Sequence, residues 1–295
     1  MSRSNPSPGA VNIHPLIVAL RTTGAGHPLF CLPGAGGNVY IFEEMVAALP
    51  EGQPVYAIDM ESLGESGQEF TIEQLAPIYL EIVRSIQSKG PYYFCGYSFG
   101  GLVAYEMAQR LIDEGDSATL VGLLDATNPA MLLNLSQSDA AEFHKTYLLD
   151  RLKKYRDSLM RGDLKAFAGR GLAFIVARLG KLFTPALKVG FRMFNKPLPQ
   201  TFRYNDPVFQ RAWRAYVPKQ YAKSLVVFRV DERGPEHDRD PSMGWDACVT
   251  NGVQVHVVPG GHVDMMRMPS VRVIAEKLAT YLDNGSSRDE SIATS

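Results

Sequence analysis

The chain has 295 residues, of which 45% are hydrophobic and 21% charged, and its formal net charge is −1. This composition is that of a globular protein and excludes a fibrous or largely disordered chain. No window of about 18 apolar residues is free of charge, so we expect no stable membrane insertion. The opening residues MSRSNPSPGA lack the apolar region of a secretory signal, and a cytoplasmic location is therefore expected.

Seven short apolar runs bounded by Gly, Pro or Asp predict β-strands along the chain. They are Leu16–Leu20, Pro28–Leu32, Val55–Ile58, Tyr92–Cys95, Thr119–Leu124, Leu225–Val230 and Val253–Val258. Helical patterns lie between them, over Asn38–Leu49, Thr71–Gln87, Gly101–Gly115 and Ser270–Leu282. Thr71 and Gln74 have the spacing of a capping box. Buried strands that alternate with helices predict an α/β fold with a mostly parallel sheet covered on both faces.

The alternation of strands and helices breaks between about residues 129 and 223, which have an almost entirely helical pattern. A helical insertion between two strands predicts a lid over the carboxyl edge of the sheet, where ligands bind in such folds. We therefore predict an α/β core in two parts, 14–128 and 224–284, with a lid over 129–223. The ends, 1–13 and 285–295, are predicted to be disordered.

The charge is unevenly distributed. Residues 145–223 contain 18 Lys and Arg against 4 Asp and Glu, which leaves 12 basic and 27 acidic residues in the rest of the chain. A basic block in an acidic protein is either a solvated helical face or a docking surface for an anionic partner.

The three cysteines, Cys31, Cys95 and Cys248, lie far apart in the sequence. Two of them fall in apolar strand-like runs, which favours buried thiols in a reducing compartment over a disulfide framework or a metal site.

The segment FCGYSFGGL contains the pattern G-x-S-x-G at Gly96-Tyr97-Ser98-Phe99-Gly100. A predicted strand precedes it and a predicted helix follows it, which is the context that a nucleophile elbow requires. Such a turn would raise the Ser98 hydroxyl above the sheet edge, at the positive end of the helix. We therefore predict that Ser98 is a nucleophile.

A serine nucleophile needs a general base and an acid that orients it. His262 lies in the loop after the last strand and before the last helix, which favours it as the base. His256 alternates within the strand VQVHVV and is typical of a structural histidine. Two acids compete, because Asp125 and Asp231 both end strands at the edge that carries Ser98. The pattern of residues alone leaves both acids open.

The glycine-rich segment LPGAGG lacks both the G-x-G-x-x-G spacing and the lysine of a phosphate-binding loop. We therefore expect no nucleotide site. A serine nucleophile with a histidine base needs no metal or redox cofactor, so none is expected, and no nucleic-acid partner is expected either.

The sequence resembles the thioesterases of the α/β-hydrolase fold that release products from nonribosomal peptide, polyketide and fatty-acid synthases. The resemblance rests on PLFCLPGAGGNVYIF, GYSFGGLVAYEMAQRL, LVGLLDA and the segment from DPSMGW to GGHVDMM, and it extends from about Leu16 to Leu282. It implies Asp125 as the acid, as in synthase-terminal members, whereas the editing type would use Asp231. It also implies the amides of Ala35 and Phe99 as the oxyanion hole. The predicted substrate contacts are Tyr97, Gly34, Gly36 and Val263.

The function that this resemblance implies is the release of an acyl, polyketide or peptidyl chain from the phosphopantetheine thioester of a carrier protein. The carrier protein is the expected partner, with the basic lid as a candidate docking face. A carboxylester hydrolase and an acyltransferase to an external amine or alcohol would use the same three residues. A non-enzymatic role of the basic lid, in binding a membrane or a partner, is a further alternative.

Overall fold

The computed structural model describes residues 14–60, 69–133, 207–232 and 240–293. Within these residues, seven strands form one sheet in the order β1-β3-β2-β4-β5-β6-β7. The strands are β1 (Ile17–Arg21), β2 (Leu29–Leu32), β3 (Val55–Ile58), β4 (Tyr92–Tyr97), β5 (Ala118–Leu124), β6 (Leu225–Val230) and β7 (Val253–Val258). Each predicted strand is present, and the bounds differ by at most two residues.

The sheet is parallel except at one edge, where β1 runs antiparallel to β3. The other neighbouring pairs are parallel, so the carboxyl ends of β2, β4, β5, β6 and β7 meet at the same edge. The central strands β2 and β4 are buried at every residue. This matches their continuous apolar sequences, because a parallel strand in the middle of a sheet is covered on both faces.

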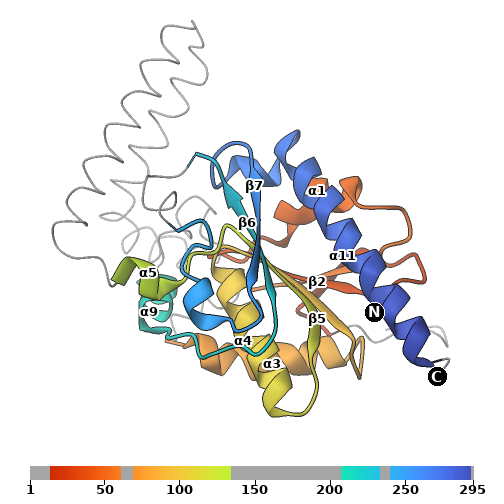
Figure 1. Ribbon diagram of the computed structural model, residues 1–295, viewed down its shortest axis with the longest axis horizontal. Helices are drawn as coiled ribbons and strands as arrows, with labels where there is room; N and C mark the ends of the chain where they lie inside the picture. Colours follow the sequence, from red (N-terminus) through yellow and green to blue (C-terminus); the bar gives the residue numbers. More distant parts are fainter. Residues whose placement is uncertain (1–13, 61–68, 134–206, 233–239, 294–295) are drawn as a thin grey trace, which may run out of the picture.

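Helices cover both faces of the sheet (Figure 1). The helices α3 (Ile72–Arg84) and α4 (Phe99–Asp113) pack on one face, and α1 (Glu43–Ala48) and α11 (Ser270–Ala293) on the other. The predicted capping box is present at the start of α3, where Thr71 Oγ1 accepts from Gln74 N and the Gln74 side chain accepts from Thr71 N. The architecture is the predicted α/β class.

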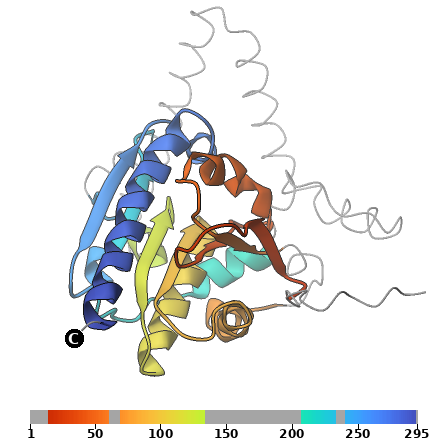
Figure 2. The same cartoon turned by 90° about the vertical axis from the view of Figure 1, so that its right-hand side faces the viewer.

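Helix α11 runs along the outside of the sheet as far as Ala293 (Figure 2). It thus extends through most of the segment 285–295 that the sequence predicts to be disordered. The apolar pattern ends at Leu282, so the polar residues beyond it carry no packing signal that would distinguish a helical extension from a disordered tail. Among the described helices, none has both the length and the apolar character needed to cross a membrane.

The predicted lid falls largely outside the described residues, which include only its two ends. These ends contain α5 (Pro129–Leu133) and α9 (Pro207–Ala215). Phe209 of α9 packs edge-on against Phe99 and Phe70, with ring centroids 5.0 and 5.3 Å apart. Helix α9 therefore packs on the α/β core, although it belongs to the segment predicted as a lid.

The three cysteines are buried and free. Cys31 and Cys95 are register partners on the neighbouring strands β2 and β4, and both side chains belong to the core on the α1 and α11 face. The prediction of buried thiols is confirmed.

Glycines bring the start of α4 into contact with the ends of its neighbouring strands. A Cβ atom on Gly96 would overlap the carbonyl group of Gly100, and one on Gly100 would overlap the carbonyl oxygens of Leu32 and Pro33. These obstacles are backbone atoms, which cannot rotate away as a flexible side chain could. The helix therefore begins directly against the carboxyl ends of β2 and β4 only because these positions are glycine.

We predict that Gly100→Ala lowers the free energy of unfolding by about 3 kcal/mol or more, because the added methyl group displaces the end of β2. The matched control is Gly122→Ala on β5, where a Cβ atom would lie 3.5 Å from Leu278 Cδ2, at ordinary contact distance. The control leaves stability unchanged or raises it by up to about 1 kcal/mol, because alanine loses less entropy on folding. Chemical denaturation measures both. Equal stabilities of the two variants would contradict this account of the turn.

Candidate active site

The residues predicted to carry chemistry lie at the carboxyl edge of the sheet. Ser98 follows β4, Asp125 follows β5, Asp231 follows β6, and His262 lies in the loop between β7 and α11. Parallel strands bring these positions together although they are up to 164 residues apart in the chain. This edge is where open α/β sheets form their ligand sites.

Ser98 occupies a sharp turn between β4 and α4. Its backbone has φ 52° and ψ −118°, a region that residues with a side chain rarely adopt. The Ser98 N–H donates to Leu124 O at 2.9 Å, and its carbonyl oxygen accepts from Gly101 N at 3.0 Å. These bonds and the glycine contacts hold the strained turn, as expected for a nucleophile elbow.

Asp125 is held in a single orientation by the ends of β5 and β6. Its backbone also has a positive φ, of 49°, and its N–H donates to Phe228 O at 2.7 Å. The carboxylate is completely buried, and its Oδ1 atom accepts from Val230 N at 3.3 Å. This leaves Oδ2 directed at the neighbouring loop.

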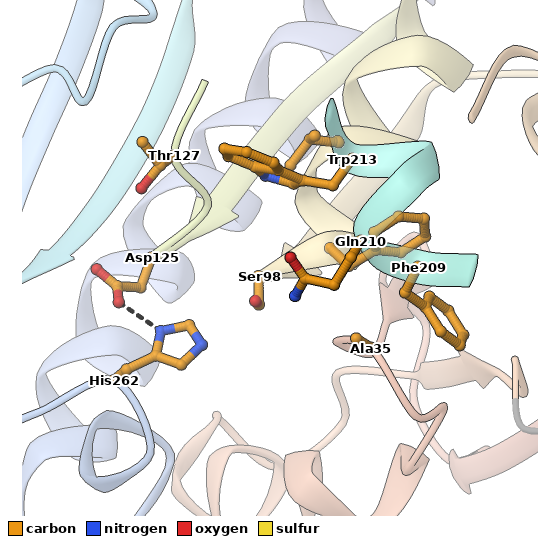
Figure 3. A pocket seen from close by; sticks show the side chains of 10 residues that line it. Ala35, Ser98, Asp125, Thr127, Phe209, Gln210, Trp213 and His262 are labelled. Carbon is orange, nitrogen blue, oxygen red and sulfur yellow. Dashed lines mark hydrogen bonds and ion pairs between the residues drawn. The ribbon is translucent and has the colours of Figure 1, made fainter. Parts of the chain in front are cut away.

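His262 contacts Asp125 through its ring. The Nδ1 atom lies 2.5 Å from Asp125 Oδ2, and the histidine side chain is 24% exposed. Because a carboxylate only accepts, the proton of this bond resides on Nδ1, which leaves Nε2 to accept a proton from another group. Figure 3 shows Ser98 on the side of the imidazole that faces away from Asp125.

The alternative acid Asp231 has a different partner. It is exposed, and its Oδ1 atom accepts from Gly260 N at 2.8 Å. Glu232 N donates in turn to Gly260 O at 3.2 Å. Asp231 therefore holds the backbone at Gly260, in the loop that carries His262. The carboxylate that contacts the imidazole is that of Asp125, not that of Asp231.

The alternative base His256 lies on β7, on the α11 side. Its Nε2 atom is 2.7 Å from the Tyr281 hydroxyl of α11, and its ring lies against Phe228. Burial lowers the pKa of His256, with a smaller contribution from the Lys277 ammonium. It is a structural residue that links the sheet to α11.

The two predicted oxyanion donors lie beside Ser98. Phe99 is the first residue of α4, and the first N–H groups of a helix have no acceptor within the helix. Ala35 follows Gly34 in a turn that is closed by Gly37 N donating to Gly34 O at 3.1 Å. Gly36 and Gly37 have φ 96° and 77°, which favours glycine at both positions. Both Ala35 and Phe99 line the cavity at Ser98.

The four residues predicted as substrate contacts lie near Ser98 or His262 but outside the described lining of the cavity. Gly34 lies against the Tyr97 ring and Ser98, Gly36 is in the turn after β2, and Val263 is 62% exposed. Tyr97 is buried and contacts His262. None of the four is among the described residues that line the cavity.

A cavity of about 390 Å³ opens at Ser98, between the sheet edge and α9. Its polar lining includes Ser98, Asp125, Thr127, Gln210 and His262. Its apolar lining includes Ala35, Phe99, Leu102, Phe209 and Trp213. Figure 3 shows Gln210 and Trp213 across the cavity from His262, with Ser98 between them.

Sequence reasoning missed the contribution of α9 to this cavity. Gln210 and Trp213 are three residues apart and therefore share one face of the helix. That spacing was visible in DPVFQRAWRAYV. The packing of Phe209 on Phe99 and Phe70 determines which face of α9 points at Ser98. No local sequence signal predicts that contact.

A second set of residues holds the loop after Asp125, a role that the sequence did not reveal even though the segment DPSMGW was part of the resemblance. The buried Trp245 donates from Nε1 to Ala126 O at 2.7 Å. Asn128 Nδ2 donates to Gly244 O at 2.8 Å, and Asp240 Oδ2 accepts from Gly244 N at 2.8 Å. Residues 240–245 thus fix the backbone next to the carboxylate that contacts His262.

The residues that follow α9 are anchored on α4, the helix that begins directly after Ser98. The Tyr216 hydroxyl donates to Glu106 Oε2 of α4 at 3.0 Å, in a buried environment. Burial raises the pKa of Glu106, although the bond from Tyr216 and the charge of Arg110 act in the opposite direction. Gln109 Nε2 donates to Lys219 O at 2.8 Å, and the Tyr105 hydroxyl donates to the same carbonyl at 2.6 Å. These bonds fix α9 over the cavity.

Together these groups provide the parts of acyl transfer. The cavity holds a hydroxyl on a strained turn, an imidazole oriented by a buried carboxylate, and a helix N-terminus that favours developing negative charge. The apolar lining beside them is suited to the chain of an acyl group.

Comparisons with known proteins identify the family of the chain. Residues 27–281 match the family model described as Thioesterase domain. Similar curated proteins include a non-reducing polyketide synthase of Pseudevernia furfuracea, 26% identical over 94% of this chain, and another of Cladonia grayi, 32% identical over 90%. Chondramide synthase of Chondromyces crocatus is 28% identical over 93%. The chain spans only 13%, 13% and 7% of the length of these relatives.

Two solved structures have the same fold. The NocB thioesterase domain, in covalent complex with a fluorophosphonate nocardicin G analog, matches with a TM-score of 0.62 and 19% identity, over 90% of this chain and 99% of that one. The Vlm2 thioesterase domain bound with a dodecadepsipeptide matches with a TM-score of 0.58 and 20% identity, over 89% and 96%. The predicted α/β-hydrolase fold is confirmed, and the chain belongs to the thioesterase domain family.

Proposed function

We propose that the protein is a serine thioesterase that releases an acyl, polyketide or peptidyl chain from the phosphopantetheine thioester of a carrier protein. The chain is held as an ester on Ser98 and leaves by hydrolysis or cyclisation. The observation that carries this proposal is the His262–Asp125 contact of 2.5 Å beside Ser98 on its strained turn. Family membership and the similarity to polyketide and peptide synthases support the choice of a thioester over an oxygen ester.

In the first half-reaction, Ser98 Oγ attacks the thioester carbonyl carbon and its proton passes to His262 Nε2. The carbonyl oxygen becomes negatively charged in the tetrahedral intermediate, and the amides of Ala35 and Phe99 stabilise it. Asp125 stabilises the imidazolium that His262 has become. The C–S bond then breaks, and the imidazolium returns the proton to the departing sulfur.

In the second half-reaction, water or a hydroxyl or amine of the bound chain attacks the Ser98 ester. His262 removes a proton from the attacking group, and the second tetrahedral intermediate uses the same two amides. When the ester bond breaks, the proton returns to Ser98 Oγ. Water as the attacking group gives an acid, and a group within the chain gives a ring.

We propose that the acyl chain lies against Phe99, Phe209 and Trp213. These side chains form the apolar wall of the cavity, and Gln210 offers an amide that can bond to a polar group of the chain. The basic block over 145–223 is the proposed docking face for an acidic carrier protein. Most of that block lies outside the described residues.

The function is tested by loading Ser98 with acyl groups. We expect the intact mass to increase by one acyl group after incubation with acyl thioesters of a carrier protein or of N-acetylcysteamine. Ser98→Ala gains no mass, because the attacking oxygen is absent. Turnover of short nitrophenyl esters without any thioester turnover would indicate a carboxylester hydrolase instead. Products joined to an added amine or alcohol would indicate an acyltransferase.

The role of the acid is tested by a matched pair of substitutions. Asp125→Asn lowers kcat by about 10⁴, because an amide in this position no longer favours the proton on Nδ1 of His262. Asp231→Asn has little effect, because the asparagine oxygen still accepts from Gly260 N. Steady-state kinetics on one acyl thioester measures both variants. A large loss in Asp231→Asn with a small loss in Asp125→Asn would reverse the assignment.

The apolar wall is tested by Trp213→Ala, which enlarges the cavity. We expect kcat/KM for a long or branched acyl thioester to rise by about tenfold relative to kcat/KM for a short one. A hydrophobic pocket discriminates between substrates by roughly tenfold for each methylene group. Val217→Ala is the control, because Val217 is 74% exposed and follows α9 outside the described lining. An unchanged ratio in Trp213→Ala would remove this residue from the chain-binding wall.

A further inference from the structure

Tyr97 precedes Ser98 at the end of β4, yet its side chain points to the opposite side of the sheet from α4. Strand alternation places Tyr93, Cys95 and Tyr97 in the core on the α1 and α11 side. The Tyr97 side chain is 2% exposed, and it packs in the same cluster as Met265 and Met266 of the loop after His262. This burial leaves little surface for contact with a substrate.

Two contacts join Tyr97 to His262. The Tyr97 hydroxyl donates to the His262 carbonyl oxygen at 2.9 Å, across 165 residues of sequence. The phenol ring stacks on the imidazole with centroids 4.9 Å apart and an angle of 21° between the planes. One side chain therefore holds both the backbone and the ring of the proposed base.

Tyr97 also contacts the turn that carries Ala35. A Cβ atom on Gly34 would lie 3.1 Å from Tyr97 Cδ1 and 3.3 Å from Ser98 Cβ, so the Gly34 backbone lies close against both side chains. Tyr97 thus precedes Ser98 in the chain, stacks on His262 and contacts the turn that carries Ala35.

The stack also has an electrostatic consequence. The face of a phenol ring is negative, and a cation within about 6 Å of its centroid is attracted to it. In the proposed reaction, His262 becomes an imidazolium when it takes the Ser98 proton. The Tyr97 ring therefore interacts more strongly with the transition state than with the resting enzyme, which raises kcat rather than lowering KM.

We propose that Tyr97 is a positioning residue for the base: its hydroxyl fixes the His262 backbone, and its ring orients the imidazole and stabilises the imidazolium. This inference rests on the proposed function. It replaces the prediction from sequence that Tyr97 contacts the substrate.

The test compares Tyr97→Phe and Tyr97→Leu with wild type on one acyl N-acetylcysteamine thioester. Tyr97→Phe keeps the stack and loses the bond to the His262 carbonyl, so kcat falls about 3- to 10-fold. Tyr97→Leu also loses the ring, so kcat falls about 10- to 100-fold. KM stays within about twofold in both variants. A raised KM with unchanged kcat would show a substrate contact and overturn the proposal.

Matched controls separate positioning from general loss of packing. Tyr93→Phe and Tyr93→Leu change a tyrosine that is also fully buried on the same strand and face, and whose ring stacks on His27 instead. We expect kcat in the Tyr93 variants to remain within about twofold of wild type. Equal losses of kcat in the Tyr93 and Tyr97 series would reduce Tyr97 to a packing residue.

Two further measurements keep the proposal testable if a leucine variant does not fold or if the proposed function is wrong. We expect the His262 Nδ1 proton, in its 2.5 Å bond to Asp125, to give a far-downfield proton resonance that shifts in Tyr97→Phe and not in Tyr93→Phe. The rate at which a fluorophosphonate labels Ser98 depends on the base but not on a thioester. Wild type that is labelled without turning over thioesters would contradict the proposed function, while slower labelling of Tyr97→Phe would still support the role of Tyr97. An unmoved resonance with unchanged labelling would overturn it.

Discussion

The arrangement of the site depends on one steric constraint, the direct contact between the first turn of α4 and the ends of β2 and β4. Gly96 and Gly100 allow this contact because a side chain on either would overlap backbone carbonyl groups. The contact forces Ser98 into a backbone conformation with φ 52° and brings the Ala35 turn beside it. Ser98 and both proposed oxyanion donors are therefore positioned by backbone packing, which requires no rearrangement during a reaction.

Asp125 and His262 are positioned by hydrogen bonds rather than by backbone packing. Asp125 is completely buried, and a buried carboxylate is stable only where hydrogen bonds replace its water. Val230 N and His262 Nδ1 provide such bonds, and the loop beside Asp125 is held by Trp245 and Asn128. Residues from three segments of the chain, 125–128, the end of β6 and 240–245, thus fix one imidazole. Tyr97 connects the two halves of the site, because it directly precedes Ser98 in the chain and its ring stacks on His262.

Sequence patterns were sufficient for the sheet and for the positions of the chemical groups. Buried parallel strands have continuous apolar runs, and a strained serine turn requires its glycines, so both leave local signals at Val55–Ile58 and at Gly96–Gly100. Contacts between distant segments leave no such signal. The side of the sheet to which Tyr97 points, and the face of α9 that carries Gln210 and Trp213, depend on packing across more than 100 residues of sequence. The same holds for the acid, because the path of the loop after β7 determines whether the His262 ring contacts Asp125 or Asp231.

The anchoring of α9 bears on how such a protein could acquire new specificity. Tyr216 and Lys219 are hydrogen-bonded to α4, the helix that directly follows Ser98, so the chain after α9 is fixed to the helix that positions Ser98. Substitutions of Phe209, Gln210 or Trp213 can then change the wall of the cavity while the bonds to α4 keep α9 in place. The shape of the cavity and the position of Ser98 can therefore be varied separately.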